Sequence, residues 1–161
     1  MKSLKFKTEL SLILIFSVFS ILFAFYVEYV LEHKPCNLCL LQRLPYILSI
    51  ILIILVTIFK NLERLLFLIL SLIFLFGSLL ALYHVGIERG LISESYICGT
   101  GIDTSSTDKT EILNQLENKI ISCKDVTFTI FGLSLATINT FISAVIATIS
   151  LNIFLKYEKK R

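Results

Sequence analysis

Four long stretches without Asp, Glu, Lys or Arg together occupy more than half of the chain. They are Leu10–Val27, Leu44–Phe59, Leu65–Ile87 and Val126–Leu155. A helix needs about 20 residues to cross the ~30 Å hydrocarbon layer of a bilayer, so the first, third and fourth stretches span it unaided. The second is shorter, and extending it back through Leu40 and Leu41 places Gln42 and Arg43 in its first turns, at the membrane surface.

The pattern therefore predicts an all-α fold, an integral membrane four-helix bundle. The chain of 161 residues is 56% hydrophobic and 17% charged, and its length suits one membrane domain over residues 1–161. Its Lys and Arg residues form no basic stripe interleaved with aromatics, which excludes nucleic-acid binding. We expect helices over about 10–28, 38–59, 65–87 and 126–155, with connecting loops at about 29–37 and 88–125.

The first stretch has one alternative interpretation, a cleaved signal peptide, because lysines precede it. It is long for a signal peptide and runs into Glu28 without the small-x-small pattern that precedes a cleavage site. We expect a retained helix.

Charge predicts the orientation of the bundle. Residues 1–9, 60–64 and 156–161 hold nine Lys or Arg and three acids, whereas residues 28–43 and 88–125 hold six Lys or Arg and nine acids. Because Lys and Arg in short segments near a spanning helix resist translocation, the first set is expected to be cytoplasmic and the second external. Both termini are then cytoplasmic.

All four cysteines fall in the segments predicted to be external. Cys36 and Cys39 lie at the first loop, and Cys98 and Cys123 lie in the second. On the oxidising face of a bacterial membrane an even number of cysteines normally pairs, but four cysteines allow three pairings and the sequence does not choose among them.

The Cys36-Asn37-Leu38-Cys39 segment opens the second predicted helix. Free N–H groups and the positive end of the helix dipole stabilise a thiolate there, and thiolates are the reactive species in disulfide exchange. Arg43, four residues beyond Cys39, would add a cation on the same helix face.

The second loop is rich in glycine and serine after Cys98. Asp108 and Glu111 then resemble a capping box, and apolar residues recur at helical spacing up to Ile121. We predict a short amphipathic helix on the bilayer surface between the two loop cysteines.

The cysteines have two non-catalytic interpretations. Both pairs could be structural disulfides of a membrane scaffold, although a Cys-x-x-Cys bridge closes too small a loop to stabilise a fold much. A four-cysteine zinc site usually has two tight pairs, and this chain has one, so we expect no metal.

Four features of the chain stand out together: Cys36-Asn-Leu-Cys39-Leu-Leu-Gln42-Arg43, then Tyr83-His84-Val85-Gly86-Ile87-Glu88, the second cysteine pair, and Phe131-Gly132-Leu133-Ser134-Leu135-Ala136-Thr137-Ile138-Asn139. In this combination they resemble the DsbB family of bacterial disulfide bond formation proteins. The resemblance implies a membrane enzyme of the bacterial inner membrane that reoxidises a soluble DsbA-like thioredoxin-fold protein and passes the electrons to ubiquinone or menaquinone.

Roles for the cysteines follow from the resemblance by position. It implies that Cys98 forms the intermolecular disulfide with the partner and that Cys123 is its resolving mate. Cys36 would exchange with this loop pair, and Cys39 would meet the quinone. The chain has no c-type heme motif, dinucleotide-binding glycines or iron–sulfur spacing, which leaves a lipid-soluble quinone as the electron acceptor.

Arg43, Gln42 and His84 are the candidate quinone-binding residues. Arg43 would polarise a quinone carbonyl, and its alternative role is an interfacial arginine that reaches for water. His84 would hydrogen-bond a quinone oxygen or deliver a proton, and its alternative role is to pair with Glu88. We interpret Gly77 and Ser78 as close helix contacts.

The rival enzyme class is the four-helix vitamin K epoxide reductase type. There the tight cysteine pair belongs to the last helix, whereas here it opens the second, which disfavours that class.

Overall fold

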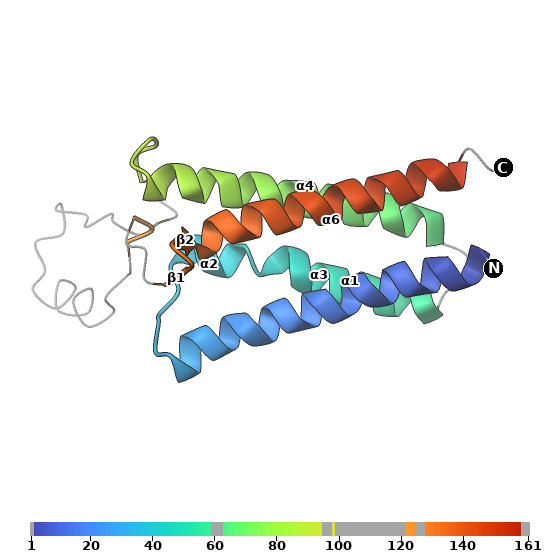
Figure 1. The fold of residues 1–161 in the computed structure, drawn as a ribbon, viewed down its shortest axis with the longest axis horizontal. Helices are drawn as coiled ribbons and strands as arrows, with labels where there is room; N and C mark the ends of the chain where they lie inside the picture. The colour runs from blue at the N-terminus through green and yellow to red at the C-terminus, as the bar shows by residue number, and fades with distance from the viewer. Residues whose placement is uncertain (1, 59–62, 95–97, 99–121, 125–127, 159–161) are drawn as a thin grey trace, which may run out of the picture.

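The computed structural model describes residues 2–58, 63–94, 98, 122–124 and 128–158 of the chain (Figure 1). Its helices are α1 (Lys2–Phe25), continued by a π-helical turn η1 (Tyr26–Val30), then α2 (Asn37–Leu41), α3 (Leu44–Ile58), α4 (Glu63–Glu88) and α6 (Leu135–Glu158). Four segments are long and apolar enough to span a membrane: Lys7–Val30, Asn37–Ile58, Arg64–Glu88 and Leu135–Lys156. The predicted four-helix membrane bundle is confirmed.

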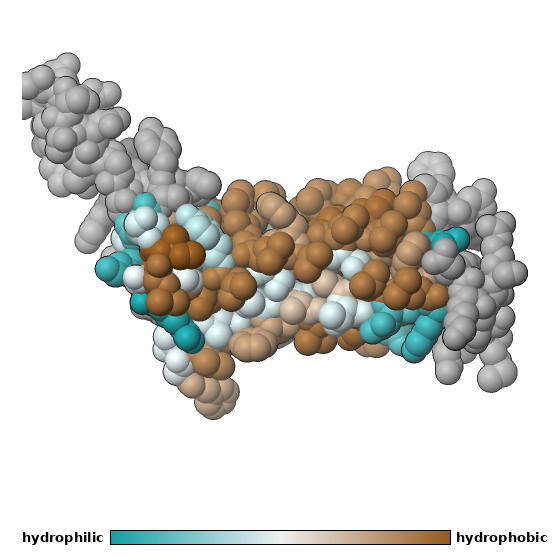
Figure 2. Space-filling view, turned by 90° about the horizontal axis from the view of Figure 1, so that it is seen from above, coloured by the Kyte–Doolittle hydropathy of each residue, from teal (hydrophilic) through white to brown (hydrophobic). Residues whose placement is uncertain are grey.

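The long helices run side by side, and α1 begins at the same end of the bundle at which α6 finishes (Figure 1). Helix α4 packs along α6, and α3 packs against both α1 and α4. Figure 2 shows hydrophobic residues along the length of the bundle and hydrophilic ones gathered towards its two ends, the distribution expected of a protein surrounded by lipid.

The core joins all four long helices. Buried residues of α1 (Leu10, Ile13) meet Ile53 of α3, Phe67 and Phe74 of α4 and Ile146 of α6. The hydroxyl of Ser49 donates a 2.9 Å hydrogen bond to Ser17, so α1 also makes a polar contact inside the bundle. Helix α1 is thus packed as an integral part of the fold.

Small residues allow close approach between helices, as predicted. A Cβ added to Gly77 of α4 would lie 2.9 Å from Cγ of Pro45 on α3. Ser78 donates a 3.1 Å hydrogen bond to the carbonyl of Thr140 on α6.

The second predicted helix is interrupted, which corrects the expectation of one continuous helix over 38–59. Helix α2 ends at Leu41, Gln42 and Arg43 form a turn, and α3 starts at Leu44. Pro45 explains the break, because it has no backbone N–H to bond the carbonyl of Leu41 four residues earlier and its ring crowds that carbonyl. A proline is instead tolerated in the first turn of a new helix, which is its position in α3. The break gives Gln42 and Arg43 different surroundings from those of an uninterrupted helix.

The predicted start of the last helix at 126 is wrong. Strands β1 (Thr129–Ile130) and β2 (Leu133–Ser134) form an antiparallel hairpin, and α6 starts only at Leu135. The two turn residues, Phe131 and Gly132, have φ values of 51° and 79°, which a helix cannot contain. Ser134 then accepts a 3.2 Å hydrogen bond from the N–H of Thr137 and caps α6.

The surface helix predicted between the loop cysteines lies outside the described residues. Of the same loop, residues 122–124 are described and are tied to the chain that follows α4: a carboxylate oxygen of Glu94 accepts hydrogen bonds from the hydroxyl of Ser122 and, at 3.0 Å, from the backbone N–H of Lys124. This places Cys123 close to the end of α4.

Candidate active site

The four cysteines lie at one end of the bundle. Cys98 and Cys123 form a disulfide with a Cα–Cα distance of 5.5 Å, while Cys36 and Cys39 are free thiols. Cys36, Cys98 and Cys123 belong to one buried cluster that also contains Leu38 of α2 and Ile87 of α4, with Cys39 packed against it. Of the three pairings that the sequence allows, the structure has the loop cysteines joined and the helix-mouth pair reduced.

Cys36 occupies the N-cap of α2. Its sulfur accepts a 3.3 Å hydrogen bond from the backbone N–H of Cys39, in the place where a cap oxygen usually sits. The expectation that the sulfurs of this pair sit at a helix N-terminus is confirmed for Cys36. The N–H bond and the helix dipole both favour a negative charge on this sulfur.

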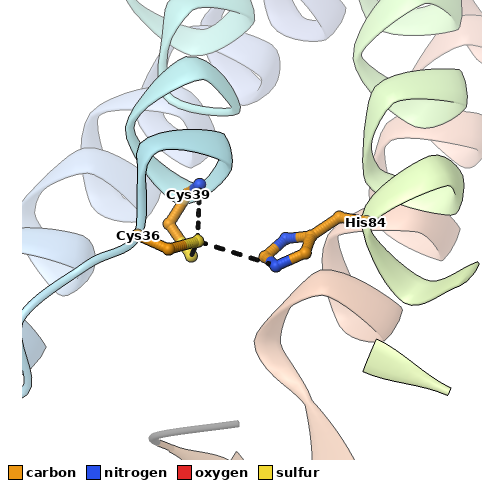
Figure 3. A group of neighbouring side chains, drawn as sticks. All are labelled: Cys36, Cys39 and His84. Carbon is orange, nitrogen blue, oxygen red and sulfur yellow. Dashed lines mark hydrogen bonds between the residues drawn. The ribbon is translucent and has the colours of Figure 1, made fainter. Parts of the chain in front are cut away.

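A histidine from a different helix completes the surroundings of Cys36. The Cys36 sulfur lies 2.7 Å from that of Cys39 and 3.6 Å from Nε2 of His84 (Figure 3). The hydrogen bond with Cys39, helped by the hydrogen bond with His84, lowers the pKa of Cys36 to about 5 against the opposing effect of burial. Cys36 is therefore a thiolate at neutral pH.

His84 also connects the two cysteine pairs. Its Nε2 lies 3.3 Å from the backbone carbonyl of Cys123 and 3.8 Å from a carboxylate oxygen of Glu88, one turn further along α4. The other oxygen of Glu88 accepts a 2.5 Å hydrogen bond from Ser134 at the start of α6. The pairing of His84 with Glu88, which was the alternative to a functional role, is present and coexists with the contact to Cys36.

Gln42 is buried, with both ends of its amide in use. The structure places its Nε2 2.8 Å from Nδ1 of His84, while its Oε1 accepts a 2.8 Å hydrogen bond from Nδ2 of Asn139 on α6. Asn139 in turn accepts a 2.5 Å hydrogen bond from the hydroxyl of Tyr46 on α3. The sequence analysis did not predict a role for Tyr46 or for the side chain of Asn139. The only feature of the sequence that marks these two residues is that each is a polar group inside an apolar helix.

Arg43 is paired with an acid from the first span. Its Nη1 donates to Oε2 of Glu28 at 2.6 Å, and its guanidinium carbon lies 5.3 Å from the ring centroid of Phe25. Both charged side chains are mostly buried. A carboxylate this close to an apolar span needs a partner, and hydropathy and charge along the chain do not show that the partner is Arg43.

A cavity of about 430 Å³ adjoins this site. Cys36, Cys39, Gln42, Arg43, His84 and Glu88 contribute to one part of its wall, and apolar side chains of α1 and α6 form much of the rest, including Phe16, Phe19, Phe23, Ile138 and Ile142. An apolar hollow with a few converging polar groups is typical of a small-molecule site. The pattern of the sequence did not single out these apolar residues.

The three candidate quinone-binding residues thus all border the cavity. The sulfurs of Cys36 and Cys39 and a ring nitrogen of His84 lie within 4.8 Å of one another, a spacing that would also suit metal ligands. This group differs from the four-cysteine zinc site considered above, because Cys98 and Cys123 are bonded to each other.

Four membrane-spanning helices, with a disulfide and a free Cys-x-x-Cys pair packed together at one end, define a multi-pass membrane thiol–disulfide oxidoreductase. The chain matches the family model described as "Disulfide bond formation protein DsbB" over residues 7–153. It therefore belongs to the DsbB family, and the resemblance seen in its motifs is confirmed.

A relative in Rickettsia prowazekii (strain Madrid E), named "Uncharacterized protein RP370", is 28% identical over 153 residues, which cover 93% of this chain and 88% of the relative. No solved structure matches the chain.

Proposed function

We propose that this protein takes two electrons from the dithiol of a soluble DsbA-like thioredoxin-fold protein and passes them through Cys98/Cys123 and Cys36/Cys39 to a membrane quinone. The observation that carries the proposal is the packing of a disulfide and a reduced Cys-x-x-Cys pair in one buried cluster, joined by His84. The overall reaction converts the partner's dithiol to a disulfide and the quinone to a quinol, so electrons and protons balance.

The first exchange uses the loop disulfide. A thiolate of the partner attacks the Cys98 sulfur, a new intermolecular disulfide forms, and the Cys98–Cys123 bond breaks with release of the Cys123 thiolate. The partner's second thiol then displaces Cys98, which leaves the partner oxidised and the loop pair reduced. Each step trades one disulfide for another and needs no further oxidant.

The second exchange joins the loop pair to the helix-mouth pair. Cys36 trades bonds with a loop cysteine, and its low pKa makes it a good leaving group when the Cys36–Cys39 disulfide is reduced. His84 contacts both Cys36 and the backbone of Cys123, so it holds the two segments close together. At the end of this step the helix-mouth pair carries the two electrons.

The cavity beside Cys39 fits a quinone. A volume of about 430 Å³, largely apolar walls, and the donor groups of Arg43 suit a flat ring with two carbonyl oxygens. When bound, a quinone accepts two electrons and two protons. Arg43 would hold one of its oxygens by a hydrogen bond, the apolar residues of α1 and α6 would exclude water, and Cys39 would face the ring while His84 forms part of the cavity wall.

The positive-inside rule supports placing this end of the bundle at the external face of the bacterial inner membrane, with both termini in the cytoplasm. That face is where a soluble dithiol partner and an oxidising compartment are available.

Quinone reduction by the purified protein tests the proposal. With a reduced thioredoxin-fold substrate, quinol should form in proportion to the substrate thiols consumed, and replacing any of the four cysteines with alanine should abolish the steady-state rate. Cys98→Ala should form no mixed disulfide with the substrate, whereas Cys123→Ala should accumulate one. A non-catalytic scaffold with two structural disulfides would leave both quinone and substrate thiols unchanged.

A further inference from the structure

Nε2 of His84 is surrounded by groups that accept hydrogen bonds. Among the described residues, its contacts are the Cys36 sulfur at 3.6 Å, the Cys123 carbonyl at 3.3 Å and a Glu88 carboxylate oxygen at 3.8 Å. A carbonyl, a carboxylate and a thiolate can accept hydrogen bonds but cannot donate them. Nε2 faces the Cys36 sulfur (Figure 3). The neutral ring therefore carries its proton on Nε2.

On its other side the ring faces the amide of Gln42, and a hydrogen bond from Asn139 fixes the orientation of that amide. The Oε1 of Gln42 accepts from Asn139, so its NH₂ group is the end that faces Nδ1 of His84. Because an amide NH₂ only donates, Nδ1 must present its lone pair.

The orientation of Asn139 is fixed in the same way. Its Oδ1 accepts from the hydroxyl of Tyr46 at 2.5 Å and from that of Ser143 at 3.2 Å, which turns its NH₂ group towards Gln42. The donors thus run in one direction, from Tyr46 on α3 through Asn139 on α6 and Gln42 at the helix break to His84 on α4. His84 and Gln42 are only 3% and 7% exposed, so water does not replace these partners.

We propose that Gln42, held by Asn139 and Tyr46, is a positioning residue that keeps Nδ1 of His84 unprotonated and directs the Nε2 proton at Cys36. This deepens the proposed function, on which its meaning for catalysis rests. A neutral donor stabilises the Cys36 thiolate by a hydrogen bond without binding it in a full ion pair, and a less stabilised thiolate is the better nucleophile. Gln42, which sequence analysis offered as a quinone ligand, acts through the histidine instead.

Gln42→Glu is the sharpest variant, because a carboxylate accepts where the amide donates. The groups around the ring other than residue 42 are unchanged, namely Cys36, Cys39, Glu88 and the Cys123 carbonyl. In the variant, Nδ1 should become protonated and keep its proton to a pH at least about one unit higher than in the wild type. Asn139→Leu should also raise the pH at which His84 loses its second proton, but by less, because the Gln42 amide is then free to turn.

The measurement is ¹⁵N NMR of histidine-labelled, reduced full-length protein in lipid nanodiscs, followed over pH. The chain has two histidines, so a His33→Gln variant assigns the His84 signals. Once the wild-type ring is neutral, it should show a proton on Nε2 and none on Nδ1. Ser78→Ala removes a different hydrogen bond between α4 and α6 and should leave the His84 spectrum unchanged.

Two results overturn the proposal: an Nδ1–H tautomer in the wild type, or a Gln42→Glu protein in which Nδ1 loses its proton at the wild-type pH. The first needs no variant, so it holds even if a substitution impairs folding. Neither result involves quinone or partner, and so failure here is separate from failure of the proposed electron transfer.

A second readout follows the reactivity of the sulfur. Gln42→Glu should extend alkylation of Cys36 to lower pH, by about the tenfold gain in thiolate that one pH unit represents. A residue that only packs the helices together would not shift this profile, and an unshifted profile also contradicts the proposal.

Discussion

Nη1 of Arg43 lies 2.6 Å from Oε2 of Glu28, so the cation of the candidate quinone site is paired with an acid from the end of the first span. The pair joins the helix break after α2 to η1, beside the cavity. Arg43 is therefore available to a ligand only through the donors that Glu28 does not use.

Removing the charge of Glu28 should strengthen quinone binding. In Glu28→Gln the guanidinium is released to a quinone oxygen, and we expect the quinone KM to fall by roughly threefold to tenfold, the effect of a partly buried ion pair of about 1 kcal/mol. Arg43→Ala should raise the same KM with little change in the KM for the protein substrate.

Glu32→Gln is the matched control, because it removes an acid four residues further along the chain, beyond η1, at an exposed position. Steady-state kinetics over a range of quinone concentrations measure the quinone KM of each variant. Unaltered quinone dependence in both Glu28→Gln and Arg43→Ala would assign the pair to the membrane interface instead.

Cys36 should react as a thiolate in acid. Its pKa of about 5 predicts that alkylation of the reduced protein stays near its maximal rate down to about pH 6, whereas an ordinary thiol with a pKa of about 8.5 would already be slow at pH 7. His84→Ala should move the midpoint to higher pH, while His33→Ala should not. Mass spectrometry of iodoacetamide-labelled peptides measures this, and a midpoint near 8.5 in the wild type would contradict the described geometry.

The same lowered pKa makes the stability of the reduced protein depend on pH. The folded state holds fewer protons than the unfolded state between about pH 5 and the ordinary thiol pKa of about 8.5. The stabilisation by Cys36, relative to Cys36→Ser, should be complete above that range, decrease as the pH falls through it, and vanish below about pH 5. Unfolding in mixed micelles at several pH values tests the sign, and a difference that grows on acidification would refute it.

Gly77 should not tolerate a side chain. A methyl group there would meet the rigid ring of Pro45 at 2.9 Å, so α3 and α4 would have to move apart. We expect Gly77→Ala to lower the free energy of unfolding by about 1–3 kcal/mol, the usual cost of overpacking. Leu79→Ala, at a position 58% exposed on the same helix, is the control and should cost less; equal losses would show that the contact is not tight.

Reporter fusions test the orientation inferred from charge. A fusion at Lys60 should be active only with a cytoplasmic reporter, and one at Tyr96 only with a reporter that works outside the cytoplasm. An external Lys60 would reverse the bundle and remove the cysteines from the oxidising compartment.

Much of the fold could be predicted because a bilayer imposes one rule on the whole chain. A helix that crosses it must be long and apolar, and absence of charge located all four spans. The same rule failed at 128–134, because a short apolar hairpin is also free of charges, and only Phe131 and Gly132 with their positive φ mark the turn. Pro45 also indicates a break after Leu41, although the uncharged pattern alone predicted one continuous helix there.

The candidate site also contains residues that the sequence could predict and residues that it could not. The cysteines, Arg43 and His84 belong to motifs that a linear pattern can display. The partners of Arg43 and Gln42 do not, because Glu28 is 15 residues from Arg43 and Asn139 is 97 residues from Gln42 along the chain. Such pairs are set by how helices pack, which hydropathy does not encode.

The central claim is that the two cysteine pairs exchange disulfides, and disulfide mapping of Cys39→Ala tests it most directly. Without Cys39, the Cys36 thiolate should attack the Cys98–Cys123 bond, form a disulfide with one loop cysteine and release the other as a free thiol, with no added oxidant. Peptide mass spectrometry of the purified variant should find Cys36 joined to Cys98 or Cys123. A variant that keeps the Cys98–Cys123 bond intact beside a free Cys36 would contradict the account.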